Sequence, residues 1–198
     1  MRGLLRFGLI ALMALILTAC GGKDKPAFQS TDVTDAPMGG DFRLTDHTGQ
    51  SKSLADYHGK VVVVFFGYTH CPDACPTTMA ELAGAMKQLG DKANQVQVLF
   101  ISVDPERDSK ELLAQYVPAF DARFVGMTGT PDQVHAVADK FKVVYQKVPA
   151  SSGDPKNYTV DHSAGSYIFD KTGKLRLFVN YGAGASVFAH DIGLLLAS

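Results

Sequence analysis

The sequence has few cysteines, no excess of one charge and no apolar run long enough to span a membrane. Its 198 residues carry a formal net charge of −1 and show no basic stripe, so nucleic acid is not an expected partner. Only three cysteines are present, whereas disulfide-held small domains use several bridges that close long loops. The cysteines are therefore not a structural framework, and we expect their role to be chemical.

The N-terminus is typical of an export signal. Arg2 and Arg6 precede an apolar run over residues 7–17. This run is shorter than a membrane-spanning helix, which needs about 20 residues. The run ends in Leu-Thr-Ala-Cys at Cys20, which resembles a bacterial lipobox. We expect residues 1–19 to be a lipoprotein signal peptide and Cys20 to carry the lipid after cleavage. An uncleaved anchor or an ordinary signal peptide is the alternative, and either one also exports the domain.

The expected location is therefore a bacterial cell membrane, with the domain on its periplasmic or outer face and held by acyl chains. Gly21 follows the lipobox cysteine and leaves inner and outer membrane open. Residues 20–37 are polar, contain Gly-Gly and Pro26 and lack periodicity, which predicts a flexible tether. Residues 38–198 are enough for one domain with a real core.

Strand and helix patterns alternate through this domain. Residues 61–66 form a continuous run of β-branched and aromatic residues, which predicts a central strand buried on both faces. Further predicted strands cover residues 96–103, 124–127, 143–148, 166–170 and 174–179, and predicted helices cover residues 76–89, 109–116, 130–141 and 186–196. This order predicts an α/β fold with a mixed sheet, and a buried strand leading into a cysteine loop and a helix is the thioredoxin arrangement.

The remaining two cysteines, Cys71 and Cys75, lie in that loop, and each is followed by a proline. Proline disfavours the α region for the residue before it, so we expect both cysteines to be extended. Pro76 suits the first helical position, which would put Cys75 at the helix N-cap with a lowered thiol pKa. Two thiolates favour Cu(I) or Zn, but zinc sites normally have four ligands and no second cysteine pair follows. A structural disulfide is the alternative reading.

A third ligand should be one of the six histidines. His70 adjoins Cys71, but neighbours along an extended chain point to opposite sides. His162 precedes the predicted strand at residues 166–170, at a loop end that could fold over the cysteine loop, and the residues alone leave the choice open. Asp104 follows a buried strand and could tune the site, although a turn or capping role is favoured, and Asp161 could orient His162.

Four motifs in order resemble the Sco/SenC family of copper-handling proteins in cytochrome c oxidase assembly. They lie at residues 59–60, 65–78, 102–108 and 160–163. The resemblance implies a thioredoxin-like fold with an added β-hairpin, and copper, as Cu(I) or Cu(II), held by Cys71, Cys75 and His162. It also implies that the domain receives copper from an upstream donor and metallates the binuclear copper centre of the oxidase, or reduces the cysteines of that centre.

We expect a copper chaperone, which is not an enzyme. Two other functions remain as alternatives. A thiol-disulfide reductase would use Cys71 and Cys75 as a redox pair without metal or His162. A thioredoxin-like peroxidase is disfavoured, because Thr69 lies two residues before Cys71 and Val64 stands where such sites have a proline.

Overall fold

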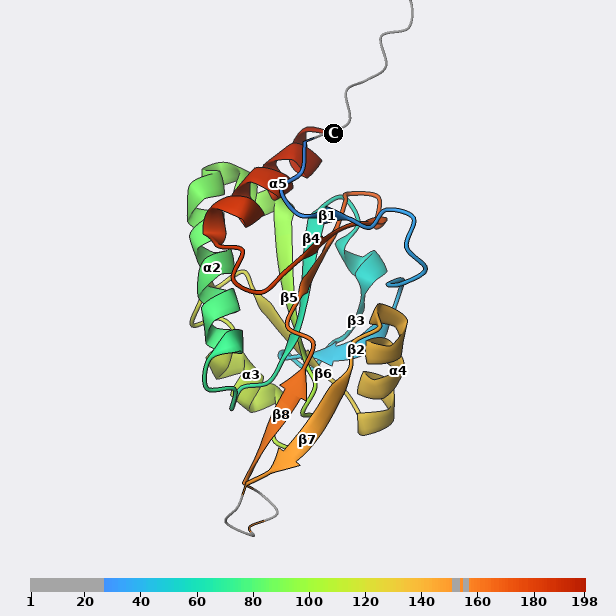
Figure 1. Cartoon of the computed structure of the whole chain (residues 1–198), viewed down its shortest axis with the longest axis vertical. Helices are drawn as coiled ribbons and strands as arrows, with labels where there is room; N and C mark the ends of the chain where they lie inside the picture. Colours follow the sequence, from blue (N-terminus) through green and yellow to red (C-terminus); the bar gives the residue numbers. More distant parts are fainter. Residues whose placement is uncertain (1–26, 151–153, 155–156) are drawn as a thin grey trace, which may run out of the picture.

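The computed structural model describes residues 27–150, 154 and 157–198, so the predicted signal peptide and Cys20 lie outside the described residues. The described chain forms one eight-stranded sheet, and β7 and β8 pair separately (Figure 1). In spatial order the sheet contains β1 (Thr31–Asp32), β10 (Leu175–Val179), β9 (Ser166–Phe169), β4 (Val61–Gly67), β5 (Val96–Ser102), β6 (Val125–Thr128), β2 (Arg43–Asp46) and β3 (Ser51–Ser53).

Strand β4 lies at the centre of this sheet, as its apolar sequence predicts. All seven of its residues are buried, and it runs parallel to β5 but antiparallel to β9. The sheet is therefore mixed. Because a fully apolar strand is stable only with both faces covered, β4 requires helices on either side.

Helices supply that cover. Figure 1 shows α2 (Ala74–Leu89) and α5 (Ala185–Ala197) on one face of the sheet and α4 (Pro131–Phe141) on the other. The short helix α3 (Lys110–Tyr116) follows β5, and the described residues also form 3₁₀ turns at η2 (Leu54–Tyr57) and η3 (Gly90–Gln95). This is the α/β arrangement expected from the alternating sequence pattern.

The predicted helix starts at Ser109 and Thr130 are confirmed as N-caps. The Ser109 side chain accepts the backbone N–H of Leu112, and Thr130 forms a reciprocal capping box with Gln133. Each cap satisfies backbone donors that the first helical turn leaves unpaired. The caps determine the residues at which α3 and α4 begin. The cap at Ser109 therefore also sets where the loop between β5 and α3 ends.

The hairpin of β7 (Tyr145–Pro149) and β8 (Tyr158–His162) lies at the end of the molecule away from the C-terminus (Figure 1). The sequence predicts the first strand but treats residues 158–162 as a loop. Four of the five residues of β8 are exposed or only partly buried and only Val160 is buried, so its apolar pattern is too weak to be recognised. The two strands pair antiparallel, with Tyr145 opposite His162.

The segment before the domain also differs from expectation. Thr31–Asp32, inside the expected tether, pairs with β10, and the buried Asp191 of α5 accepts the backbone N–H groups of Gln29 and Ser30. This part of the expected tether therefore packs against the domain.

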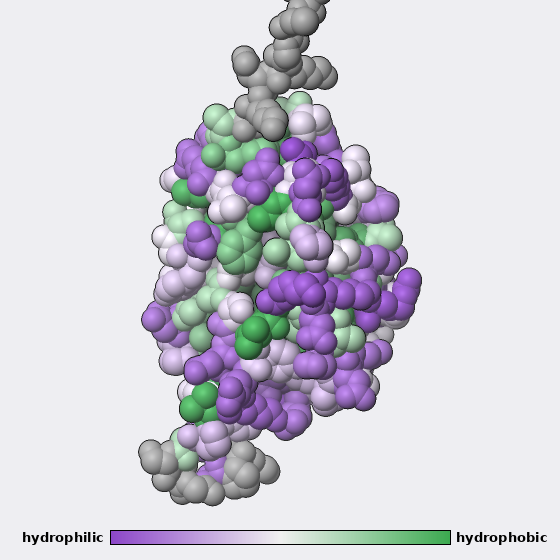
Figure 2. Space-filling view, turned by 45° about the vertical axis from the view of Figure 1, so that its right-hand side comes forward, coloured by the Kyte–Doolittle hydropathy of each residue, from purple (hydrophilic) through white to green (hydrophobic). Residues whose placement is uncertain are grey.

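Figure 2 shows a face on which hydrophilic residues separate small apolar patches.

Candidate metal centre

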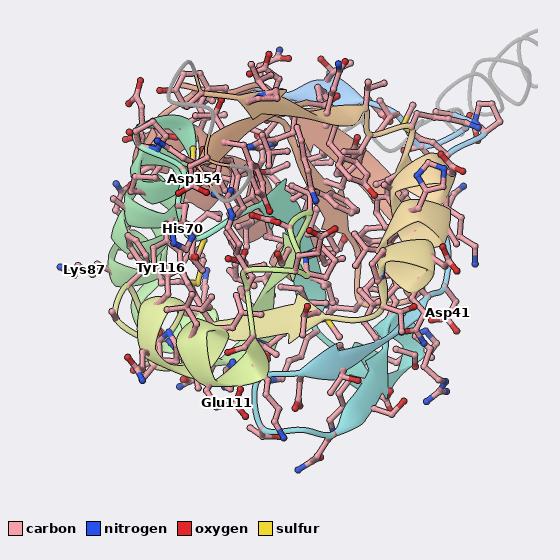
Figure 3. The ribbon with its side chains drawn as sticks, turned by 90° about the horizontal axis from the view of Figure 1, so that it is seen from below. Asp41, His70, Lys87, Glu111, Tyr116 and Asp154 are labelled. Atoms are coloured by element: carbon pink, nitrogen blue, oxygen red, sulfur yellow. The ribbon has the colours of Figure 1, made fainter. Side chains whose placement is uncertain are left out.

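Three parts of the chain meet at one point near the base of the hairpin. Cys71 comes from the loop after β4, Cys75 from the first turn of α2 and His162 from the last position of β8. One potential ligand atom from each of these side chains lies within 4.8 Å of the other two. Figure 3 views the molecule from this end, with His70 and the hairpin residue Asp154 on the side of α2.

Cys75 is the innermost of the three. Its side chain has no exposed surface. It packs against Gly67 of β4, where an added Cβ would lie 2.9 Å from the Cys75 Sγ atom. A side chain on β4 at this point would occupy the space of the sulfur. The close approach of α2 to the end of β4 therefore depends on glycine.

The expectation of an extended Cys75 with an acidic thiol is wrong. Asp73 occupies the N-cap, Cys75 is helical, and burial raises the pKa of its thiol above the usual value. Pro76 is tolerated because the N–H groups of the first turn have no partner within the helix. Burial disfavours the charged sulfur more than the hydrogen bond from the Tyr68 backbone favours it.

Cys71 is the more accessible sulfur. It is partly buried, and its Sγ atom accepts the backbone N–H of Cys75 at 3.4 Å. The first turn of α2 thus directs a donor at Cys71 and not, as the sequence suggested, at Cys75.

His162 presents one ring nitrogen to the sulfurs. Its Nδ1 atom lies 3.1 Å from the carbonyl oxygen of Ser163, and its Nε2 atom lies 3.4 Å from the Cys75 Sγ atom. A carbonyl can only accept, so this contact assigns the proton to Nδ1 and leaves the Nε2 lone pair facing the cysteines. Burial lowers the pKa of His162 and favours the neutral imidazole that a metal requires.

The donor set fits a soft ion. Two sulfurs and one imidazole nitrogen suit copper, while magnesium and calcium prefer oxygen ligands. A cavity of about 330 Å³ opens beside Cys71 and His162, and Pro72, Asp73 and Tyr181 also line it. Another ligand can approach through this opening.

The comparisons with known proteins agree with this geometry. The sequence profile of the family described as SCO1/SenC matches residues 30–197, which is most of the chain. This chain belongs to the SCO1/SenC family. The SCO2-like protein of Rickettsia felis is 34% identical to it over 169 residues, which cover 84% of this chain and 82% of that protein.

Solved structures of Sco proteins share the thioredoxin-like fold. The copper-bound structure of ScoI from Bradyrhizobium japonicum is 37% identical, covers 80% of this chain and 99% of its own, and gives a TM-score of 0.72. BsSco, described as carrying a disulfide switch and as a member of the Sco family of cytochrome c oxidase assembly proteins, is 25% identical with a TM-score of 0.61, over 87% of this chain and 98% of its own. Among the described residues of this SCO1/SenC member, no helix has the length and apolar character needed to cross a membrane.

Neither predicted carboxylate contacts the imidazole of this SCO1/SenC member. Asp161 is exposed, and the acceptor for the His162 Nδ1 atom is Ser163 instead. Asp104 is fully buried and accepts the Tyr158 hydroxyl at 2.7 Å and the Arg107 Nε–H at 2.5 Å. Asp104 therefore acts on the hairpin and not directly on a ligand.

Sequence reasoning also missed Asp108, which lies in the same motif. Its buried carboxylate accepts the backbone N–H and the hydroxyl of Thr69, two residues before Cys71. In the sequence, Asp108 is an aspartate that follows a buried strand and directly precedes a helix N-cap. An ordinary turn residue has the same pattern, so the sequence did not identify Asp108 as part of the site. Only the folded arrangement places it beneath the cysteine loop.

Proposed function

We propose that this chain is a membrane-anchored copper chaperone that binds one copper ion through Cys71, Cys75 and His162. It delivers the ion to the binuclear copper centre of cytochrome c oxidase. The observation that carries the proposal is the convergence of these three side chains from separate elements within 4.8 Å. Membership of a family of copper-binding proteins of oxidase assembly supports the same role.

The geometry suits a carrier better than a closed structural site. Two thiolates give high affinity for copper, and three ligands leave a coordination position for an incoming donor. The cavity of about 330 Å³ beside Cys71 and His162 gives a partner access to that position. Copper can then pass by ligand substitution, with Cys71, the more exposed cysteine, as the first to exchange.

The proposed partners follow from the cargo. An upstream copper donor loads the site and the copper-centre subunit of the oxidase receives the ion, at the periplasmic or outer face of a bacterial membrane. Lipid on Cys20 would hold the domain there through the residues that precede β1, which begins at Thr31.

A thiol-disulfide reductase is the second candidate, and one observation favours it. Cys71 is accessible and receives a backbone N–H, while Cys75 is buried behind it, which is the arrangement of an attacking and a resolving cysteine. In this role the protein would reduce the cysteines of the oxidase copper centre, and a thiol reductant would regenerate it.

Oxidase assembly in a strain that lacks this gene separates the two functions. The strain is complemented with the wild type, with Cys71→Ser, with His162→Ala, or with His135→Ala as a control, since His135 is 68% exposed on α4. A copper chaperone predicts that wild type and His135→Ala restore oxidase activity while Cys71→Ser and His162→Ala do not. Full activity with His162→Ala would instead favour the reductase.

A further inference from the structure

We propose that the last residue of β5 and the loop that leads to α3 act as a bracket that sets the distance between the cysteine loop and the hairpin carrying His162. The bracket consists of Ser102, Asp104, Arg107 and Asp108. The bracket holds Tyr158 and Thr69, which are the positioning residues. The proposal rests on the proposed copper site and adds the residues that bring the cysteine loop and the His162 hairpin together.

One arm of the bracket holds the start of β8. The Tyr158 hydroxyl donates to the Asp104 Oδ1 atom at 2.7 Å, and the Arg107 Nη1 atom donates to the Tyr158 carbonyl oxygen at 2.9 Å. The Arg107 guanidinium also lies 3.5 Å from the centroid of the Tyr158 ring, and its Nε atom donates to Asp104. Tyr158 is thus held through its backbone, its ring and its hydroxyl.

The other arm holds the cysteine loop. Asp108 accepts the Thr69 hydroxyl at 2.6 Å and the Thr69 N–H at 3.1 Å. The Ser102 hydroxyl donates to Asp108 at 2.6 Å and accepts the Asp104 backbone N–H at 3.0 Å, which joins the two arms. The same few residues therefore contact both the segment before Cys71 and the strand that ends in His162.

The two carboxylates at the centre of these contacts are shielded from water. Asp104 and Asp108 have no exposed surface, and buried carboxylates are retained only where several donors satisfy them. The nearby pair of Lys147 and Glu106 joins the same hairpin to the same loop, but both side chains are largely exposed, at 44% and 58%. An exposed pair of this kind contributes little to position.

The hairpin needs such a holder because it is not part of the main sheet. Among the described strands, β7 and β8 pair with each other and with no other strand. At its His162 end β8 continues through residues 163–165 into β9, but its Tyr158 end leads to the hairpin tip. A five-residue strand is about 16 Å long, so movement at Tyr158 is transmitted along the rigid strand to the imidazole.

The test compares copper-loaded Tyr158→Phe and Arg107→Met with Tyr145→Phe, a matched control on the other strand directly opposite His162. X-ray absorption at the copper edge counts nitrogen and sulfur neighbours in either oxidation state, and transfer to a chelator gives the rate of copper loss. We expect Tyr158→Phe and Arg107→Met to weaken the nitrogen contribution and to lose copper about tenfold faster, within the range seen when outer contacts of metal ligands are removed. Tyr145→Phe should match the wild type.

Two further variants separate positioning from general loss of stability. Thr69→Val removes the hydroxyl contact of the cysteine arm and leaves the other arm intact, so it should disturb the sulfur contribution and not the nitrogen contribution. Arg107→Lys keeps the charge but lacks the planar guanidinium, so it should not restore the wild-type nitrogen signal.

Nitrogen coordination and copper loss like those of the wild type in both Tyr158→Phe and Arg107→Met would overturn the bracket, as would equal effects of Tyr145→Phe. A wild-type protein that binds no copper would overturn the proposed function itself, which is a different outcome. A fall in unfolding midpoint with unchanged coordination would also count against positioning.

Discussion

The Nε2 atom of His162 lies 3.4 Å from the Sγ atom of Cys75, although the two residues are 87 positions apart in the chain. The contact joins the last residue of β8 to the first turn of α2, and Cys71 stands beside both. Because one sulfur is buried and the other is accessible, the two cysteines are not equivalent. Their different surroundings lead to distinct predictions.

Oxidation of the cysteine pair should abolish copper binding. Both cysteines are free, and a disulfide needs a sulfur separation of about 2.05 Å, which leaves neither thiolate for the metal. We expect the oxidised protein to bind no copper and the reduced protein to bind one equivalent, measured by metal analysis after gel filtration. His162→Ala should still form the disulfide at a similar rate, since only the sulfurs react. Copper binding by the fully oxidised protein would refute the thiolate ligands.

Gly67→Ala should displace Cys75. The added Cβ would lie 2.9 Å from both the Cys75 Sγ atom and the Phe100 ring, in a region without exposed surface. Overpacking of this kind costs about 1–3 kcal/mol, so we expect that loss of unfolding free energy in urea together with weaker copper retention. Gly193→Ala is the matched control, because its Cβ meets only Leu89 at 4.0 Å and alanine favours a helix. Equal stability of the two variants would contradict the packing described.

Asp191→Asn should change how stability depends on pH. Burial alone raises the pKa of Asp191, but hydrogen bonds from Gln29, Ser30 and His190 outweigh it and hold the pKa below the usual value. A lowered folded pKa adds stability that is complete above the unfolded value of about 3.9 and is lost as the pH falls through the folded pKa. We expect Asp191→Asn to lose about 1–3 kcal/mol near pH 7, the typical cost of such hydrogen bonds.

The difference between wild type and Asp191→Asn should therefore shrink below about pH 4, the range of an unperturbed aspartate. Urea unfolding across this range measures it. The exposed Asp35→Asn serves as the control and should stay close to the wild type, since its ion pair with Lys174 lies at the surface. A difference that does not depend on pH would show that the charge of Asp191 contributes nothing.

Cys20→Ala should release the domain from the membrane. If the lipid on Cys20 is the anchor, the variant should no longer incorporate labelled fatty acid, and the domain should leave the membrane fraction. The copper stoichiometry of the soluble domain should not change, because the three proposed ligands lie more than 50 positions further along the chain. Retention of Cys20→Ala at the membrane through its apolar N-terminus would instead identify an uncleaved anchor.

The elements that the sequence predicts well are those with strong local patterns. The valine run of β4 needs no partner to be recognised as buried, and Ser109 and Thr130 mark their helices by cap chemistry alone. Strand β8 is the opposite case, because its partner β7 decides its conformation and its own residues are mostly polar. The prediction of an acidic Cys75 thiol failed for a related reason, since the burial of Cys75 between α2 and the end of β4 is a tertiary effect.

The site itself was predictable only in part. The spacing of Cys71 and Cys75 indicates a chemical pair, but the residues alone did not select His162, and the family resemblance did. Local sequence gives no sign that Asp104 reaches Tyr158, which is 54 positions away, or that Asp108 reaches Thr69, 39 positions away. Contacts between distant loops depend on the path of β5 and the hairpin, which the fold determines.

The most direct test of the account is X-ray absorption at the copper edge on the copper-loaded wild type and His162→Ala. Two sulfur neighbours and one nitrogen neighbour are predicted for the wild type, with loss of the nitrogen in His162→Ala and retention of both sulfurs. Identical spectra for the two proteins, or a wild-type site without sulfur, would contradict a centre built from Cys71, Cys75 and His162.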